Sequence, residues 1–264
     1  MVAVLLSMMA AGVGLAQAIQ DPKQVTLRWL RLGGILALTL LAVAATIHVC
    51  SRDAGVWAVA WPGLTAAAAC FTVQLLAVQM ARCTLQRCAA IAAFAIGALT
   101  AAASVHGVMC GGNWGAMGRN VAWISAVLDG PLMCVLLGGF VMTMLLGHAY
   151  LTAGTDMTQR PLRRLVVVLA VALVLRAAAS LLLGLLPYLA DAPDSGGRTW
   201  VLVMISARYG AGLVVPGVFT YMVHDCVKRA ANQSATGILY VASVLVIVGE
   251  GTALTLMNRT GMGF

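Results

Sequence analysis

Four histidines are the strongest candidates for chemistry in this sequence, because each stands near the end of an apolar stretch. They are His48, His106, His148 and His224. A haem with two imidazole ligands needs one histidine on each side of the ring. Two histidines from different helices at one membrane depth meet that need. The sequence therefore predicts two candidate haem pairs, His48 with His106 and His148 with His224. The alternative is four histidines that rest in the lipid headgroup region.

Four charged side chains interrupt the apolar stretches. They are Asp129, Arg176, Arg208 and Glu250. A charge at the centre of a bilayer costs at least about 2.5–3.5 kcal/mol, so such residues normally face the protein interior and find partners. We expect Arg208 to pair with Glu250 or Asp129. The pair is either structural or lines a polar site for a proton, a haem propionate or a quinol head group. Asp129 is alternatively a helix N-cap before Pro131.

Two of the seven cysteines follow histidines. Cys50 and Cys110 come two and four residues after His48 and His106. In an oxidising compartment these two cysteines can form a disulfide. The same neighbourhood holds soft ligands that suit copper or zinc, but we favour the disulfide over the metal, with free thiols as the default. We predict no metal other than a haem iron.

Common catalytic motifs are absent from the sequence. It contains no P-loop, no GxSxG elbow and no HExxH helix. Both lysines, Lys23 and Lys228, stand at the edges of apolar stretches, which argues against a retinal Schiff base within a helix. Whether the chain is an enzyme stays open.

Long apolar segments must position all of these residues. The chain is 62% apolar and 9% charged, whereas a soluble domain is nearer half apolar and a quarter charged. This composition excludes a soluble enzyme, a disordered chain and a DNA-binding module. A helix needs about 20 apolar residues to cross a bilayer. Eight runs meet that length, over 2–20, 29–50, 57–80, 86–108, 128–151, 164–189, 200–227 and 235–257.

The expected fold is therefore all-α: a polytopic integral membrane protein whose residues 1–264 form a single bundle of about eight transmembrane helices. The connections after the first, third, fifth and seventh runs carry ten Lys and Arg, against four in the remaining connections and the C-terminal end. Because basic loops stay in the cytoplasm, both termini are expected outside. The short connections fit a bacterial cytoplasmic membrane.

Two details of the runs carry further expectations. Ala16-Gln17-Ala18 is similar to a signal-peptidase site. No basic residue precedes the first run, however, so we interpret this run as a retained helix. Pro62 and Pro216 fall inside runs and are expected to kink them.

The favoured function is that of an integral membrane subunit of a respiratory or other electron-transfer complex. Such a subunit binds haem b or a quinol, and its partners are the lipid bilayer and other subunits, with no nucleic acid. The alternative is a transporter or proton-conducting protein that uses Arg176, Arg208, Glu250 and Asp129. A third hypothesis is a cofactor-free structural subunit. A working site is expected between runs 200–227 and 235–257.

Overall fold

The computed structural model describes residues 1–51, 60–110, 119–153, 158–190 and 198–264, and every regular element in these ranges is helical. Eight helical segments of the described chain are long and apolar enough to cross a membrane. The elements are α1 (Val2–Ile19), α2 (Leu27–Ser51), α4 (Ala60–Gln79), α5 (Cys83–Cys110), α6 (Arg119–Ala153), α7 (Arg160–Ser180), η2 (Leu181–Leu185), α8 (Leu186–Ala190), α9 (Arg198–Tyr209), η3 (Gly210–Val214), α10 (Val215–Lys228) and α11 (Asn232–Thr260). By length and composition these helices fit a multi-pass membrane protein.

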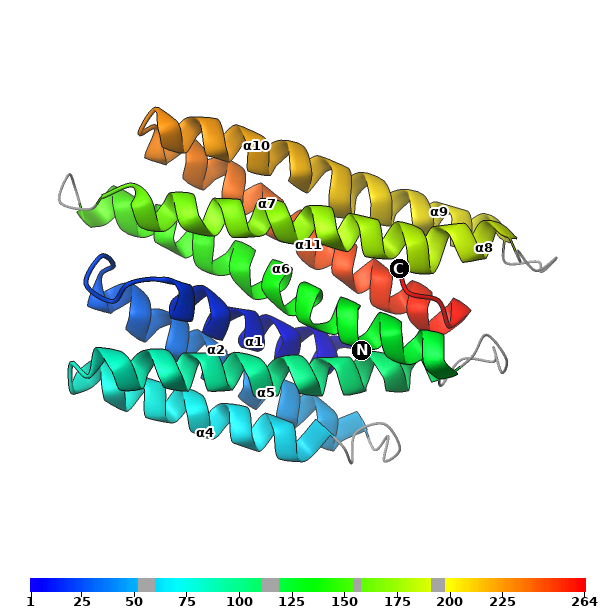
Figure 1. Ribbon diagram of the computed structural model, residues 1–264, viewed down its shortest axis with the longest axis horizontal. Helices are drawn as coiled ribbons and strands as arrows, with labels where there is room; N and C mark the ends of the chain where they lie inside the picture. The colour runs from blue at the N-terminus through cyan, green and yellow to red at the C-terminus, as the bar shows by residue number, and fades with distance from the viewer. Residues whose placement is uncertain (52–59, 111–118, 154–157, 191–197) are drawn as a thin grey trace.

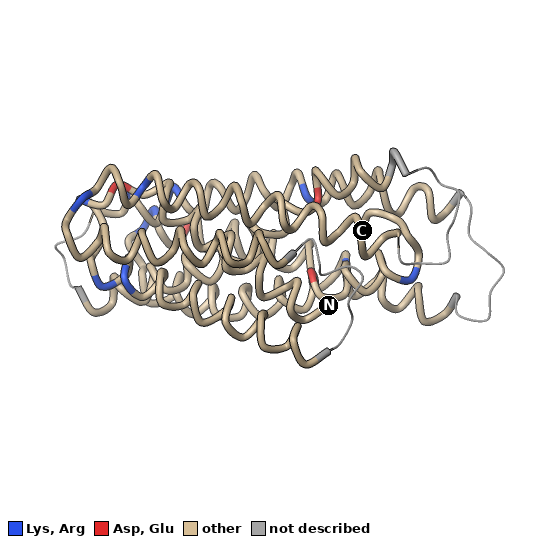
Figure 2. The backbone as a smooth tube through the Cα atoms, turned by 90° about the horizontal axis from the view of Figure 1, so that it is seen from below, with Lys and Arg blue, Asp and Glu red and all other residues tan. Residues whose placement is uncertain are grey.

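The helices lie side by side in one elongated bundle (Figure 1). The turns that join α1 to α2, α4 to α5 and α10 to α11 gather at one end, where α6 also ends and α7 begins. Both ends of the chain lie in the opposite half of the bundle. Most Lys and Arg gather at the end that holds these turns (Figure 2). The alternation of basic and less basic connections along the sequence is therefore a separation in space.

Helix α1 is a central element of the core. It packs against α2, α5 and α6, and most of its residues are buried. A Cβ on Gly12 would lie 1.8 Å from the Cys134 carbonyl oxygen, so the backbones of α1 and α6 touch there. Small residues permit such close helix contacts in membranes. Helix α1 is thus built into the core of the bundle, and its retention stays a prediction.

Two expectations about helix boundaries are wrong. Helix α6 begins at Arg119 rather than near residue 128, so Asp129 lies inside the helix and is no N-cap. In these added turns Trp123 stacks on His106 of α5, with ring centroids 4.0 Å apart, and extends the α5–α6 interface. Pro62 lies in the first turn of α4. The missing N–H of a proline breaks no hydrogen bond there, so Pro62 need not kink the helix.

Two other prolines shape the second half of the chain. Pro187 and Pro216 each follow a five-residue π-helical segment, η2 and η3, after a single intervening residue. Proline donates no hydrogen bond and clashes with the carbonyl four residues earlier, which disturbs the helix before it. The backbone N–H groups of Leu186 and Val215 instead bond five residues back, to Leu181 and Gly210. π-Helical turns of this kind are frequent at functional sites.

Candidate functional site

A cluster of four fully buried charges is the main polar feature of the described bundle. It consists of Asp129, Arg176, Arg208 and Glu250, which we name the charge cluster; all four are 0% exposed. Arg176 Nη1 lies 2.6 Å from Asp129 Oδ1, and Arg176 Nη2 lies 3.3 Å from Glu250 Oε2. Arg208 Nη1 lies 3.0 Å from Glu250 Oε1. Glu250 therefore bridges the two arginines, and Asp129 pairs with Arg176 rather than with Arg208.

Four different helices supply the charge cluster, which ties the second half of the bundle together. Asp129 comes from α6, Arg176 from α7, Arg208 from α9 and Glu250 from α11. The backbones of η3 and α11 meet beside the Arg208–Glu250 pair, where a Cβ on Gly249 would lie 2.3 Å from the Gly212 Cα atom. Two glycines thus allow the approach that the ion pair requires.

The charge cluster contains more donors than acceptors. Two guanidinium groups present ten N–H bonds, and five hydrogen bonds from them are described. The Nε and Nη2 atoms of Arg208 are buried and have no partner among the described residues. These two nitrogens form the edge of a guanidinium that binds a carboxylate through two parallel bonds. This edge of Arg208 can therefore accept a further oxyanion.

The last four residues of the chain fold back onto the charge cluster. Arg176 Nη2 donates a hydrogen bond to the Phe264 carbonyl oxygen. The Gly263 backbone N–H donates to the Leu183 carbonyl oxygen at 3.1 Å. Leu183 is four residues before Pro187, so its carbonyl receives no helical bond from that residue. The Phe264 side chain is 0% exposed. We name residues 261–264 the terminal segment.

The four histidines lie in different surroundings. His48 packs on Trp61 of α4, with ring centroids 5.0 Å apart, and His106 stacks on Trp123 of α6. These two histidines therefore belong to different helix interfaces. His148 is exposed in a groove between α2 and α6, whereas His224 is half-buried in a groove between α7 and α10. The haem pairs remain predictions, and no described contact joins the members of either pair.

Among the described residues, the cysteines form neither a disulfide nor a metal site. Cys50 and Cys110 are both free and exposed thiols. Cys110 Sγ lies 3.5 Å from Nε2 of His106, which stands one helical turn earlier in α5. Among the described residues no group of three or more His, Cys, Asp or Glu is placed to hold a metal ion. The connection 111–118, which follows Cys110, lies outside the described residues.

A second polar network lies in the first half of the bundle. Gln74 of α4 donates to the Gln17 side chain of α1, and Gln17 Nε2 donates to the Leu30 carbonyl oxygen at 2.7 Å. Both glutamines are 0% exposed. Each bond joins one helix to a neighbour and carries no charge. The network therefore acts as a structural tie among α1, α2 and α4.

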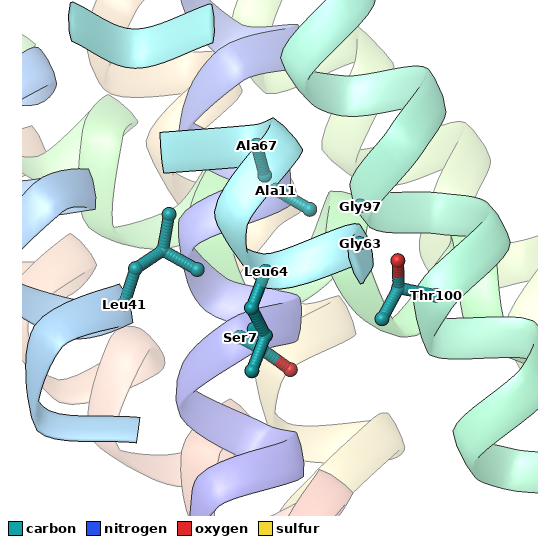
Figure 3. A pocket seen from close by; sticks show the side chains of 8 residues that line it. All are labelled: Ser7, Ala11, Leu41, Gly63, Leu64, Ala67, Gly97 and Thr100. Atoms are coloured by element: carbon teal, nitrogen blue, oxygen red, sulfur yellow. The ribbon is translucent and has the colours of Figure 1, made fainter. Parts of the chain in front are cut away.

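A small cavity in the first half of the bundle gives no sign of a site. It has room for about one water molecule, and mostly small side chains from α1, α2, α4 and α5 line it (Figure 3). Its two hydroxyls, on Ser7 and Thr100, already donate to carbonyl oxygens of their own helices at 2.7 and 2.8 Å. The cavity is best explained by helix packing. The charge cluster remains the strongest candidate site.

Comparison with known proteins adds no identity to this geometry. No protein family, no curated protein and no solved structure matches the chain. Function must therefore be argued from the charge cluster and the helices that hold it.

Proposed function

We propose that this protein is a membrane transporter that moves protons, with the charge cluster as its coupling site. The observation that carries the proposal is Glu250, a fully buried carboxylate that binds two arginines from two other helices. Ionisable residues in membrane helices commonly mark proton relays and solute pathways. Glu250 and Asp129 supply the two proton acceptors of the cluster.

Protonation of Glu250 changes the forces among three helices. The neutral acid attracts the guanidinium groups of Arg176 and Arg208 far less than the carboxylate does. The contacts of α11 with α7 and α9 then weaken together. The π-helical segments η2 and η3 follow the two arginines along the chain, and such segments allow a helix to bend there. One proton can thus change the helix arrangement at the site.

The electron-transfer hypothesis has less support. It rests on like-facing histidine pairs, whereas His48 and His106 pack in different interfaces and His148 and His224 lie in different grooves. A Soret absorption band in the purified protein would nevertheless favour it over transport. A purely structural role for the charge cluster is the remaining alternative.

Proton flux in proteoliposomes tests the proposal. The purified protein is reconstituted with a pH-sensitive dye inside the vesicles, and a pH step is applied with valinomycin and potassium to clamp the potential. We expect flux above that of empty vesicles and a loss of about tenfold or more in Glu250→Gln, which removes the proton acceptor. Asp225→Asn is the matched control, because Asp225 forms an exposed pair with Arg229 at 3.0 Å.

The outcomes distinguish a role of Glu250 in proton transport from a purely structural role. Glu250→Gln protein that stays folded but conducts as well as wild type would exclude the carboxylate from proton movement. Equal losses in Glu250→Gln and Asp225→Asn would assign the effect to general damage. If the well-folded wild type gave no flux above that of empty vesicles, the proposal that this protein moves protons would be contradicted.

A further inference from the structure

The terminal segment occupies a place on the charge cluster that suits a solute. Phe264 presents an oxygen to Arg176 and an aromatic ring to an apolar cluster. The ring packs against Tyr188, Ile205 and Leu256 of the helices, and against Met262 of the terminal segment itself. The ring of Phe264 meets Tyr188 edge to face, with centroids 6.2 Å apart. A small carboxylic acid with an aromatic ring can make the same two contacts, with its oxygen on the arginine and its ring among the apolar side chains.

From this geometry we infer that the charge cluster binds an apolar monocarboxylate in the place of Phe264, and that the terminal segment is a plug that the solute displaces. The inference rests on the proposed function and names the solute class of the transporter. Its evidence is the position of the terminal segment and the unpartnered edge of Arg208. The ion pairs of the charge cluster explain neither of these two features.

Arg208 supplies the second, independent observation. Its Nε and Nη2 atoms are buried without a described partner, which is costly for a charged group away from water. Ile205 precedes Arg208 by three residues, so both side chains project from one face of α9. The apolar cluster and Arg208 therefore share one face of α9. A carboxylate brings the oxygen and the charge that the unpartnered edge of Arg208 lacks.

The contacts of the terminal segment suit a removable plug. Gly263 lies against α6, where an added Cβ would be 2.7 Å from Ser125 Oγ and 2.9 Å from Asp129 Oδ2. Both of these oxygens lack a described partner. On the other side, a Cβ on Gly184 would lie 2.4 Å from the Gly263 carbonyl oxygen. At Gly184 the added Cβ would meet backbone, so one added methyl group there should expel the segment.

Binding of 3-phenylpropanoate to the purified full-length protein tests the inference. This acid has the ring, chain length and carboxyl group of phenylalanine without its amine. We would measure its Kd by isothermal titration calorimetry, with detergent alone as the blank. The neutral comparison ligand is 3-phenylpropanamide, which has nearly the same shape. The wild type should bind the acid weakly, because the plug competes.

Two plug variants should raise the affinity. A site that is free a tenth of the time or less in the wild type gains about tenfold or more when the plug is removed. We expect this gain in Gly184→Ala and in Phe264→Ala. Gly217→Ala is the matched control, because nothing lies within 4 Å of a Cβ placed there. Arg208→Lys in the Gly184→Ala background keeps the charge but loses the two-bond edge, and should reverse the gain.

Each outcome either supports or overturns the inference. A higher affinity in both plug variants, specific for the acid and reversed by Arg208→Lys, supports the inference. An unchanged Kd in folded Gly184→Ala and Phe264→Ala, equal binding of the amide, or no binding in any variant overturns it. Binding without proton flux would retain the carboxylate site and refute transport. Proton flux without binding would retain proton movement and refute the solute class.

Discussion

At the scale of single residues, the charge cluster shows how a membrane protein accommodates full charges at depth. Arg176 bonds to Asp129, Glu250 and the Phe264 carbonyl, whereas the one described bond of Arg208 is to Glu250. Removing one partner of a buried ion pair leaves an uncompensated charge, which costs more than the pair itself contributes. The two arginines should therefore differ in their structural importance, with Arg176 the more important.

Replacement of Arg176 tests this ranking. Arg176→Met strips both carboxylates of a partner, and we expect a loss of about 3–5 kcal/mol in the free energy of unfolding. Arg229→Met is the control, because Arg229 forms an exposed salt bridge with side-chain exposure of 75% and should lose less than about 1 kcal/mol. Unfolding in mixed micelles with increasing SDS measures both. Equal losses in the two variants would show that the charge cluster is not a stabilising network.

The sequence was sufficient to find these charges but not their partners. Four ionisable residues inside apolar runs are visible without a structure, because hydropathy reports depth along a helix. It does not report which face a residue occupies, and so His48 and His106 share an expected depth while packing in different interfaces. Phe264 gave no signal at all, because its role depends on a turn after Gly261, whose φ is 69°.

At the scale of elements, glycine and proline decide how the helices of the site meet. The sequence predicted a distortion at Pro216, and the structure gives its form as the π-helical segment η3. Pro187 produces the same form in the neighbouring crossing and was missed, although its position is equivalent. Its consequence is long-range, since the Leu183 carbonyl accepts the Gly263 N–H. The local sequence predicts that a proline leaves a helix carbonyl without its usual donor, but it does not predict which other group donates to that carbonyl.

Glycine contacts offer a sharp test at this scale. Gly249 and Gly237 both belong to α11. A Cβ on Gly249 would lie 2.3 Å from the Gly212 Cα atom, whereas nothing lies within 4 Å of a Cβ on Gly237. Gly249→Ala must separate α11 from η3 and pull Glu250 from Arg208. We expect a loss of about 1–3 kcal/mol from overpacking.

Gly237→Ala is the matched control for this test. An exposed helical glycine replaced by alanine should gain up to about 1 kcal/mol of stability. The same SDS titration compares the two variants with the wild type. If Gly249→Ala were as stable as Gly237→Ala, the close crossing of α11 and η3 would not hold in the protein.

At the scale of the whole molecule, composition and run length were enough for the architecture. Eight helical segments are present where eight apolar runs were expected, although several extend beyond those runs. The basic end of the bundle is distinct in space (Figure 2), and by the positive-inside rule we expect it to face the cytoplasm. The terminal segment, which contacts the charge cluster, lies in the opposite half of the bundle, which we expect to face outward. The direction of any transport depends on this orientation.

Helix α5 carries its own test of orientation, because it begins at Cys83 and ends at Cys110. Both cysteines are exposed and free. In variants that retain only one of them, a membrane-impermeant maleimide added to intact cells should label Cys110 and spare Cys83 until the cells are permeabilised. The two sites share one helix, one reagent and one protein, so labelling at Cys110 serves as the control for lack of labelling at Cys83. The reverse pattern would place the basic turns outside, and the charge cluster would then receive its solute from the cytoplasm.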